Sequence, residues 1–265
     1  MRQEPFFHCR NISRYYEGKP VISGIDLELC EGGIISLVGP SGVGKTTLFN
    51  ILAGVDSPDE GRIFLDGKDL TGVAGKVSYM MQKDLLLEYR TVLGNVILPL
   101  LLHGAPRQKA EHTALPFFPR FGLAGYEKKY PRQLSGGMRQ RAALLRTFMQ
   151  NNPVILLDEP FSALDALTRR SMQEWFQNII KTAINPPGLP DSSLDAAPAQ
   201  LSAVFITHDV EEAIFLSDSV HILNGNPGKI NAVFNVDAQR PRSRDFSLTP
   251  EFARLKKEIL EAVEG

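Results

Sequence analysis

The sequence holds few cysteines and no long apolar run. Only two of its 265 residues are cysteines, Cys9 and Cys30, and neither lies in a metal-ligand or C-x-x-C spacing, so we expect two reduced thiols. The longest apolar stretch, residues 92–102, is interrupted by Gly, Asn and Pro and falls well short of the roughly 20 residues of a membrane-spanning helix. Residues 1–5 carry an acid and a proline and no signal-peptide pattern. We therefore expect a cytoplasmic chain that does not itself cross a bilayer.

An excess of charge of either sign is also missing. Lys and Arg together number 29 and Asp and Glu number 30, which leaves a formal net charge of −1 at pH 7. This balance provides no long-range attraction for nucleic acid or for anionic lipid. We therefore predict no nucleic-acid partner, and we expect any membrane association to run through a partner protein.

Short apolar runs indicate the core of the fold. They are rich in Val, Ile and Leu and lack polar alternation, which is typical of a parallel sheet covered on both faces. Helical patterns, such as those of residues 46–53 and 167–182, lie between them. Strand alternating with helix predicts a doubly wound α/β core with a mostly parallel sheet. The runs are residues 34–38, 154–157, 203–206 and 219–223.

Two other regions differ from this pattern. Residues 20–32 alternate between apolar and polar side chains, and residues 60–70 form a short apolar run closed by a turn, so we expect a small antiparallel β layer there. Residues 84–150 lack strand signals and predict an inserted helical subdomain.

The last part of the chain contains an insertion and a tail. Residues 185–200 include four prolines and predict a loop or mobile insertion. The tail, residues 241–265, contains a capping Thr249 followed by Pro250, which is a good first helical residue. An amphipathic terminal helix is therefore expected, with its apolar side made by Phe252, Leu255, Ile259 and Val263.

A glycine-rich turn follows the first apolar run. It fits G-x-x-x-x-G-K-[ST] in full, between a predicted strand and a predicted helix. Its glycines let successive backbone N–H groups point at phosphate oxygens, and the helix start adds positive potential. Lys45 would reach the β- and γ-phosphates, and the Thr46 hydroxyl would complete a Mg²⁺ shell. The predicted phosphate-binding residues are Gly39, Pro40, Ser41, Gly42, Val43, Gly44, Lys45, Thr46 and Thr47.

Two carboxylates end another apolar run. Asp158 and Glu159 follow residues 154–157, at the end of a strand where open α/β sheets bind ligands. Asp158 would hold Mg²⁺ directly or through water, and Glu159 would orient or deprotonate the attacking water. A solvated acidic turn is the alternative for Asp-Glu-Pro alone, and the glycine-rich turn makes it the weaker one.

A further stretch narrows the family. Residues 134–141, Leu-Ser-Gly-Gly-Met-Arg-Gln-Arg, lie about 20 residues before the acid pair and resemble the signature of ABC ATPases. The resemblance implies that Ser135, Gly136 and Gly137 cover the γ-phosphate of a nucleotide held by a second subunit. Their chemistry is a hydroxyl and N–H groups at a helix start, although a Ser that merely caps the helix is the plain alternative.

Other residues resemble the remaining ABC landmarks, in the family's order. Gln82 resembles the glutamine that senses Mg²⁺ and the lytic water, and the Ser-Ala-Leu-Asp stretch that ends at Asp165 resembles the loop that lines the dimer seam. His208 resembles the switch histidine at the γ-phosphate. Tyr16 resembles the aromatic that stacks on adenine, but Tyr15 is adjacent, so the register stays open by one residue, as does a plain strand-packing role.

The resemblance covers residues 6–230 and implies one ABC ATPase domain over residues 1–240. It implies a P-loop NTPase core with the antiparallel layer and the helical subdomain, and ATP hydrolysis with Mg²⁺. The implied partners are a second copy or a paired ATPase subunit, transmembrane permease subunits and, indirectly, an extracytoplasmic solute-binding protein. The implied location is peripheral, on the cytoplasmic face of the cell membrane.

Finer stretches resemble one branch, the importers for nitrate, sulfonate, taurine and related solutes. They are residues 90–96, 164–169, 226–230 and 240–242. Two features depart from that branch: Glu88-Tyr89 stands where Pro-Trp is usual, and the segment 185–200 is long. Both departures bear on the solute and leave the ATPase residues intact. Residues 90–102 carry many apolar groups that we expect to be exposed at a permease contact.

Three other functions compete with this interpretation. An ABC exporter or lipoprotein-release ATPase is disfavoured only by the importer-like stretches. A non-transport ABC ATPase would carry coiled coils, zinc modules, tandem cassettes or a basic stripe, and this sequence has none. A catalytically inactive module is disfavoured because Lys45, Glu159 and His208 are all present.

Overall fold

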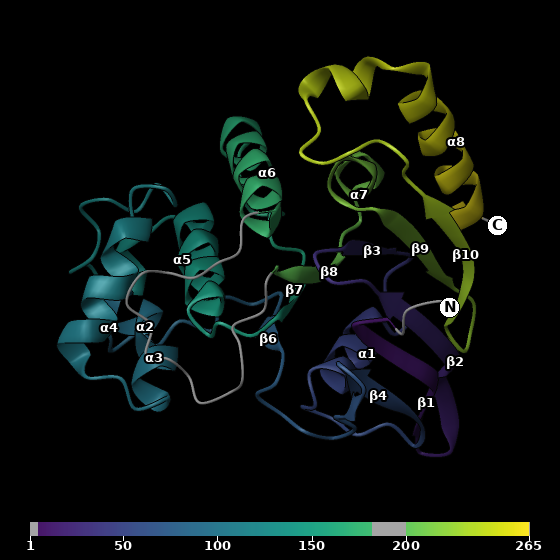
Figure 1. Cartoon of the computed structure of the whole chain (residues 1–265), viewed down its shortest axis with the longest axis horizontal. Coiled ribbons are helices and arrows are strands. Elements are labelled where there is room, and N and C mark those ends of the chain that lie inside the picture. Colours follow the sequence, from purple (N-terminus) through teal and green to yellow (C-terminus); the bar gives the residue numbers. More distant parts are fainter. Residues whose placement is uncertain (1–4, 182–199, 265) are drawn as a thin grey trace.

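A computed structural model describes residues 5–181 and 200–264. Figure 1 shows a helical lobe on the left and a central sheet with its helices in the middle. An antiparallel layer, coloured purple to blue, lies below the central sheet at the lower right. The prediction of an insertion at 185–200 lies outside the described residues, apart from Gln200.

The central sheet has six strands in the described chain, in the order β10-β9-β3-β8-β7-β6. All neighbours from β9 to β6 run parallel, and β10 pairs with β9 antiparallel at one edge. Every residue of β3, β7 and β8 is buried, as expected for a sheet covered on both faces. The strands are β3 (Ile34–Val38), β6 (Ser78–Met80), β7 (Val154–Asp158), β8 (Ser202–Ile206), β9 (Ser219–Asn224) and β10 (Lys229–Asn235).

The predicted fold class is confirmed, and two strands of this sheet were not foreseen. The four apolar runs became β3, β7, β8 and β9. Strand β6 has only three residues, too few to produce a periodic signal. Strand β10 alternates between half-buried and exposed positions at the edge of the sheet, so it lacks the apolar run of its neighbours.

A second, antiparallel sheet has the order β2-β1-β4-β5 and contains both segments assigned to the β layer. Helix α1 (Lys45–Leu52) packs between the two sheets, where Phe49 joins Phe7 and Ile25 from this layer and Leu37 from β3 in one apolar cluster. The layer therefore supports the helix that follows the glycine-rich turn. Its strands are β1 (Phe7–Tyr16), β2 (Lys19–Leu29), β4 (Glu60–Leu65) and β5 (Lys68–Asp69).

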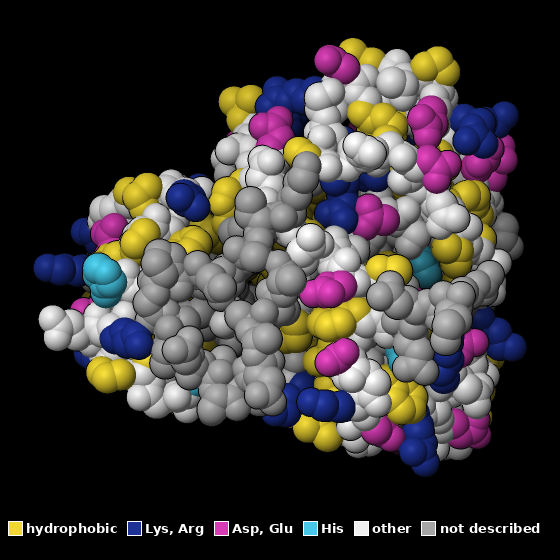
Figure 2. Space-filling model, viewed as in Figure 1, with side chains coloured by type: hydrophobic (Ala, Val, Ile, Leu, Met, Phe, Trp, Pro, Cys, Tyr) yellow, Lys and Arg dark blue, Asp and Glu magenta, His cyan; other side chains and the backbone are white. Residues whose placement is uncertain are grey.

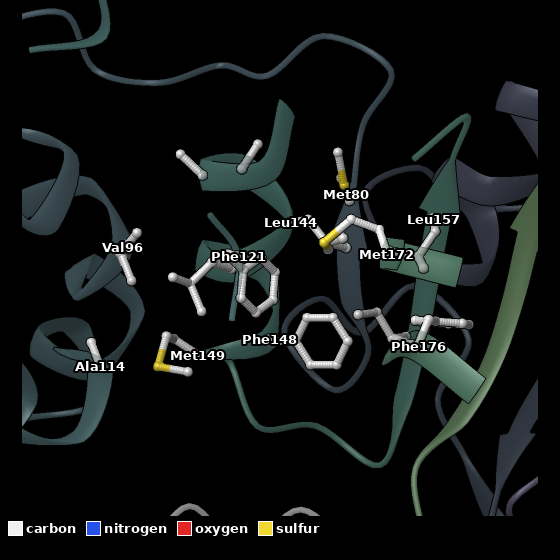
Figure 3. Packing of buried hydrophobic residues seen from close by; sticks show 14 of the residues in the cluster. Met80, Val96, Ala114, Phe121, Leu144, Phe148, Met149, Leu157, Met172 and Phe176 are labelled. Atoms are coloured by element: carbon white, nitrogen blue, oxygen red, sulfur yellow. The ribbon is translucent and has the colours of Figure 1, made fainter. Parts of the chain in front are cut away.

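The helical lobe is built from the described residues between 84 and 150, where every assigned element is a helix. Figure 3 shows its core, in which Phe121 and Phe148 meet Leu157 of the sheet and Phe176 of α6 in one buried cluster. Burying a side chain of this size contributes roughly 1.5–3 kcal/mol, so the cluster holds the lobe firmly on the sheet. The helices are α2 (Val92–Val96), α3 (Leu98–Leu102), α4 (Arg107–Ala114), η1 (Leu115–Phe117), η2 (Pro131–Gln133) and α5 (Gly136–Phe148).

One expectation about this lobe was wrong. Most of the apolar side chains of residues 90–102 are buried, because α2 and α3 turn them toward α5. Among the described residues of this stretch, only Leu102 is a strongly exposed apolar side chain, at 78 %.

Helices α6 (Ala166–Lys181), α7 (Val210–Leu216), η3 (Arg244–Leu248) and α8 (Pro250–Glu264) complete the structure. Helix α8 buries Phe252, Leu255 and Ile259 against α7 and β9. The backbone N–H of Phe252 donates to the Thr249 hydroxyl at 3.2 Å, which caps the helix at its first turn. The tail is thus packed on the core along the apolar face that its spacing indicates.

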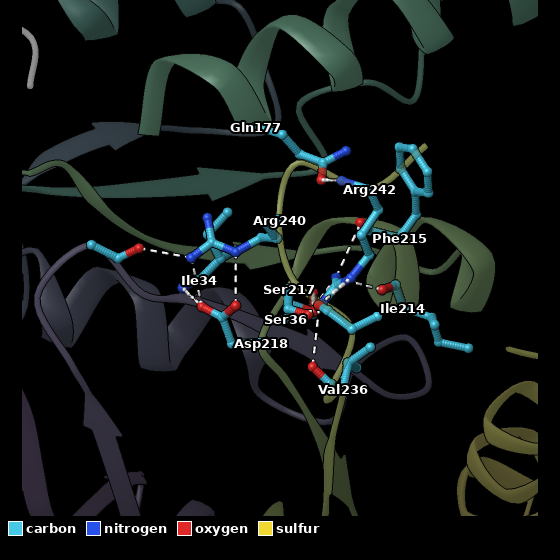
Figure 4. A network of polar contacts seen from close by, with 12 residues as sticks. Ile34, Ser36, Gln177, Ile214, Phe215, Ser217, Asp218, Val236, Arg240 and Arg242 are labelled. Carbon is cyan, nitrogen blue, oxygen red and sulfur yellow. Dashed lines mark hydrogen bonds and ion pairs between the residues drawn. The ribbon is translucent and has the colours of Figure 1, made fainter. Parts of the chain in front are cut away.

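A buried arginine anchors the start of this tail (Figure 4). The Arg242 guanidinium donates to the carbonyl oxygens of Ile214 and Ser217, at 2.9 and 2.8 Å, where α7 ends. It also donates to the Val236 carbonyl at 3.1 Å, and its backbone N–H bonds the Gln177 side chain at 2.7 Å. Burial lowers the pKa of Arg242 to about 10, so the group stays charged at pH 7. A cation among the free carbonyls of a helix end is favourable.

The surface charge and the length of the helices bear on possible contact with a membrane. In Figure 2, basic and acidic side chains are interspersed over the visible face, in keeping with the net charge of −1. None of the helices in the described part of the chain combines the length and the apolar character needed to span a membrane.

His221 makes stability depend on pH. His221 belongs to β9, and burial of its imidazole ring lowers the pKa of the side chain to about 4 from an ordinary 6.5. Below pH 6.5 the unfolded chain binds a proton that the folded chain refuses, so stability is complete above pH 6.5 and falls as the pH drops toward 4. We expect His221→Gln to abolish a loss of about 2 kcal/mol in unfolding free energy between pH 7 and 5.

Urea denaturation at the two pH values measures this difference. His112→Gln, in exposed α4, serves as the control and should keep the wild-type pH dependence. An unchanged pH dependence in His221→Gln would contradict the assignment.

Candidate nucleotide site

Four neighbouring strands deliver the predicted site to one edge of the sheet. Strands β3, β8, β7 and β6 lie side by side and parallel, so their carboxyl ends meet. The glycine-rich turn follows β3, His208 follows β8, the acid pair ends β7 and Gln82 follows β6. Residues more than a hundred positions apart in the sequence are thereby placed together.

The glycine-rich turn has the backbone that a phosphate cradle requires. Gly42 and Gly44 have φ values of 82° and 103°, in the left-handed region that favours glycine. Gly44 is the N-cap of α1, and a Cβ there would lie 2.4 Å from the Ile22 side chain. The free N–H groups of the first turn of α1 therefore face the site.

Lys45 supplies the cation of the cradle. Its Nζ donates to the carbonyl oxygens of Gly39 and Pro40 at 2.7 and 2.8 Å. Burial lowers its pKa, while the nearby carboxylates of Glu159 and Asp158 act in the opposite direction. The ammonium is held at the mouth of the turn, next to two carboxylates that need a counter-charge.

Thr46 and Asp158 form an oxygen-donor pair. The Thr46 hydroxyl donates to Asp158 Oδ2 at 3.2 Å, and Asp158 is almost fully buried at 3 % exposure. Burial raises the pKa of Asp158, the Thr46 hydrogen bond lowers it, and neighbouring Glu159 raises it further. Hydroxyl, carboxylate and amide oxygens are ligands that Mg²⁺ prefers. The residues present therefore fit the ion, which Thr46, Asp158 and Gln82 would hold.

Glu159 lies between two groups that were predicted to act with it. One carboxylate oxygen accepts from Gln82 Nε2 at 3.3 Å, and the other lies 3.3 Å from His208 Nδ1. Its backbone has φ 50°, an unusual value for a non-glycine residue and one that costs about 1–3 kcal/mol. A hydrogen bond from its N–H to the Ile206 carbonyl at 3.0 Å holds this conformation. This arrangement can orient a water and accept its proton.

These groups surround a cavity of about 280 Å³. Gly39, Pro40 and Val43 do not line it: the carbonyls of Gly39 and Pro40 accept from Lys45, and Val43 lies in the apolar core. His208 borders a small adjoining cavity that it shares with Glu159. The residues lining the main cavity are Val21, Ser41, Gly42, Gly44, Lys45, Thr46, Thr47, Gln82, Asp158, Glu159 and Ile206.

The signature residues lie away from this cavity. Ser135 is the N-cap of α5, where its hydroxyl accepts from the Met138 N–H at 3.3 Å, and both Ser135 and Gly136 are exposed. Gly137 packs against the loop before α6, where a Cβ would lie 3.1 Å from the Ala163 carbonyl. Asp165 is also exposed and accepts from the Thr168 N–H at 3.0 Å. Among the described residues, none of these four lines the cavity.

The adenine-stacking tyrosine also stays a prediction. Tyr16 and Tyr15 end β1 and are 44 % and 36 % exposed, and neither lines the cavity. The Tyr16 hydroxyl donates to Asp56 at 3.1 Å, and the Arg14 guanidinium lies 5.0 Å from its ring centroid. One tyrosine ring is thus already engaged by a cation, and the register question stays open.

Sequence reasoning missed Gln140. Its Nε2 donates to the Glu159 carbonyl at 2.8 Å, and its Oε1 accepts from the Ala163 N–H at 2.9 Å. It therefore ties the signature helix to the backbone of Glu159 and to the loop before Asp165. The available signal was its place in the stretch 134–141, on the buried side of α5. Val21 and Ile206 of the cavity wall had no signal beyond being strand residues.

Comparison with known proteins identifies the family. The family profile described as "ABC transporter" matches residues 22–162, more than half of the chain. The chain belongs to the ABC transporter family. Membership of this family, together with the geometry of the site, makes this ABC protein an ATPase that uses ATP with Mg²⁺.

Curated relatives match over almost the whole length. An uncharacterized ABC transporter ATP-binding protein of Methanocaldococcus jannaschii is 39 % identical over 90 % of this chain and 82 % of its own. A formylaminopyrimidine import ATP-binding protein of Halalkalibacterium halodurans is 36 % identical, covering 92 % and 90 %. A taurine import ATP-binding protein of Yersinia pestis is 35 % identical, covering 92 % of each chain.

Solved structures share the fold. An ATP-binding cassette described as a dimeric post-hydrolysis state bound to ADP and phosphate has a TM-score of 0.73 and 26 % identity, covering 88 % of this chain and 100 % of that one. An ATP-binding subunit of an ABC transporter has a TM-score of 0.74 at 22 % identity, covering 96 % and 99 %, and shows the fold alone.

Lys45→Ala should weaken ATP binding. The substitution removes the cation that Gly39 and Pro40 hold at the phosphates, and a charge-assisted contact of this kind is worth about 1.5–3 kcal/mol. We expect ATP affinity, measured by calorimetry, to fall roughly tenfold to a hundredfold. Lys68→Ala, on the exposed strand β5, is the matched control. Equal affinity in Lys45→Ala would refute the cradle role.

Glu159→Gln should keep ATP binding and stop turnover. The amide retains the shape of the side chain and one acceptor oxygen but cannot accept a proton from water. We expect the steady-state ATPase rate to fall by about a hundredfold or more, with ATP affinity within about threefold of wild type. A variant that hydrolyses ATP near the wild-type rate would exclude Glu159 as the base.

Proposed function

We propose that this chain is the ATP-hydrolysing subunit of an ABC importer for a small solute such as nitrate, a sulfonate, taurine or a related organic compound. The relatives named as import proteins support this role, because they align with nearly the whole chain rather than with the nucleotide site alone. The observation that carries the coupling to a membrane partner is a groove next to Gln82.

The groove has a volume of about 410 Å³ and lies where the segment after β6 meets α3. Leu85, Leu98 and Leu102 give it an apolar wall, and Leu85 and Leu102 are 53 % and 78 % exposed. Lys83 and Arg146 add positive charge, and no acidic residue is among the described residues that line it. It therefore fits a short helix with apolar side chains and an acidic group.

The position of the groove connects it to hydrolysis. Met81 and Lys83 line it, and Gln82 between them bonds Glu159 in the nucleotide cavity. A partner docked in the groove would contact Met81 and Lys83, the two neighbours of Gln82, which in turn contacts Glu159. We propose that this partner is a cytoplasmic helix of the transmembrane permease, which would place the chain on the cytoplasmic face of the membrane.

The second proposed partner is another copy of the chain or a paired ATPase subunit. Ser135 and Gly136 are exposed, and a Cβ on Gly136 would meet no atom within 4 Å in the described part of the chain. Free N–H groups and a hydroxyl at the start of α5 form an anion site that its own nucleotide cavity does not use. Two copies placed head to tail would bring each signature onto the γ-phosphate of the other.

The solute itself is proposed only as a class. The extracytoplasmic solute-binding protein would act on this chain indirectly, through the permease.

The groove is tested by Leu102→Glu. A charge at this exposed site should weaken permease docking without disturbing the core, since the side chain is 78 % exposed. Tagged full-length chain is cross-linked in its native membranes and purified, and the permease recovered is quantified. We expect Leu102→Glu to reduce recovery roughly tenfold or more, as for a central contact of an interface.

Leu248→Glu is the matched control, because Leu248 is 83 % exposed on η3, far from the groove. Equal permease recovery in Leu102→Glu, or no membrane protein with the wild type, would contradict the proposal. In vesicles, hydrolysis stimulated by solute-loaded binding protein supports import, whereas stimulation by solute on the ATP side would favour an exporter.

A further inference from the structure

An ion-pair bridge joins the segment after Gln82 to the signature helix. Arg139, in the second turn of α5, contacts Asp84 through Nε at 2.9 Å and a second guanidinium nitrogen at 3.2 Å. The same guanidinium lies 2.8 Å from Glu88. A planar guanidinium that meets two carboxylates is fixed in direction as well as in charge.

The electrostatics of the bridge agree with this geometry. The hydrogen bond to Asp84 raises the pKa of Arg139 against the effect of partial burial. Burial pushes the pKa of Asp84 upward, but its hydrogen bonds from Arg139 and the Leu86 N–H outweigh this, and its pKa lies below the ordinary value. Arg139 and Asp84 are therefore both charged at neutral pH.

A second arginine of the same helix holds the same segment. Arg146 donates to the carbonyl oxygens of Asp84 and Leu85 at 2.6 and 2.7 Å. Leu85 has φ 46°, so the chain turns sharply here and its side chain enters the groove. The segment is thus bound to α5 through both its side chains and its backbone.

The bridge stands between the parts of the ATPase that must act together. Two residues before Asp84, Gln82 bonds the Glu159 carboxylate. Ser135 caps the start of the helix one turn before Arg139. Gln140, the residue after Arg139, bonds the Glu159 carbonyl. Glu159 is therefore held from the Gln82 side and from the α5 side, and Arg139 joins these two supports.

We propose that Arg139 is a positioning residue for ATP hydrolysis, which acts through Asp84 and Glu88 to keep Gln82 and the signature helix in one fixed arrangement around Glu159. Its loss lets the two supports shift independently. A displacement of about 1 Å at a reacting group can lower a rate by up to a hundredfold. The inference concerns hydrolysis and not import; under the proposed function, the bridge also ties the groove at Leu85 to the signature.

The bridge contributes little to stability, which separates the two effects. Arg139 and Asp84 side chains are 27 % and 25 % exposed and Glu88 is 54 % exposed. Exposed ion pairs contribute roughly 0–1 kcal/mol, and a bidentate, two-carboxylate network such as this one lies at the upper end of that range. A large loss of rate without a matching loss of stability therefore indicates a positioning role.

The test compares Arg139→Gln, Asp84→Asn and the double variant in the isolated full chain. We measure kcat, ATP affinity by calorimetry and the melting temperature. Each single variant should lower kcat roughly tenfold, and the double should be no worse than the poorer single, since both break one link. ATP affinity should stay unchanged, because Lys45 and Thr46 are untouched. Arg139→Lys should be intermediate, since an ammonium cannot span both carboxylates.

Arg107→Gln is the matched control, because it breaks an ion pair to Glu111 at 2.8 Å on exposed α4 of the same lobe, and it should keep wild-type kcat. Three results would overturn the proposal: kcat in Arg139→Gln equal to the control, losses that multiply in the double variant, or a rate loss matched by lost ATP affinity or melting temperature. Permease recovery in these variants is measured separately, so failure here is distinguishable from failure of the import role.

Discussion

The parallel adjacency of strands β3, β8, β7 and β6 is the constraint on which this structure depends. Each strand ends in a group with one task, and only a parallel sheet brings all four carboxyl ends to a single edge. The two contacts of the Glu159 carboxylate, from Gln82 and His208, cross three of these strands. A different strand order would leave the turn around Lys45 intact but would place Glu159 away from it.

The rest of the chain supports that edge from three sides. The antiparallel layer packs under α1 and so sets the direction of its first turn. The helical lobe is joined to the sheet by an apolar cluster and reaches Glu159 through Gln140 of α5. The C-terminal tail holds the far end of α7 through Arg242, behind the turn that carries His208. These supports explain why a strained Glu159 backbone is tolerated, since several elements hold it in place.

The nucleotide cavity and the residues of the signature stretch lie apart within one described chain. The cavity collects phosphate-binding, acidic and amide groups, while Ser135 and Asp165 are exposed on other loops. Exposed capping hydroxyls and free N–H groups are costly to leave without an acceptor in a dry interface, and a nucleotide phosphate supplies one. The segment from Gln82 to Glu88 is common to the nucleotide cavity, the groove and the Arg139 bridge: Gln82 bonds Glu159, Leu85 lines the groove, and Asp84 and Glu88 pair with Arg139.

By itself the sequence determined the chemistry of the ATPase and most of its core, because these are local properties. The cradle of residues 39–47 is a contiguous motif, and β3, β7, β8 and β9 are apolar runs long enough to be recognised. Only the tertiary structure decided that most apolar side chains of residues 90–102 are buried, that Gln140 reaches Glu159, and that Arg139 bridges to Asp84 and Glu88. Each of these depends on which helix face meets which distant segment. That choice arises from packing across the fold, and no spacing within one stretch of sequence records it.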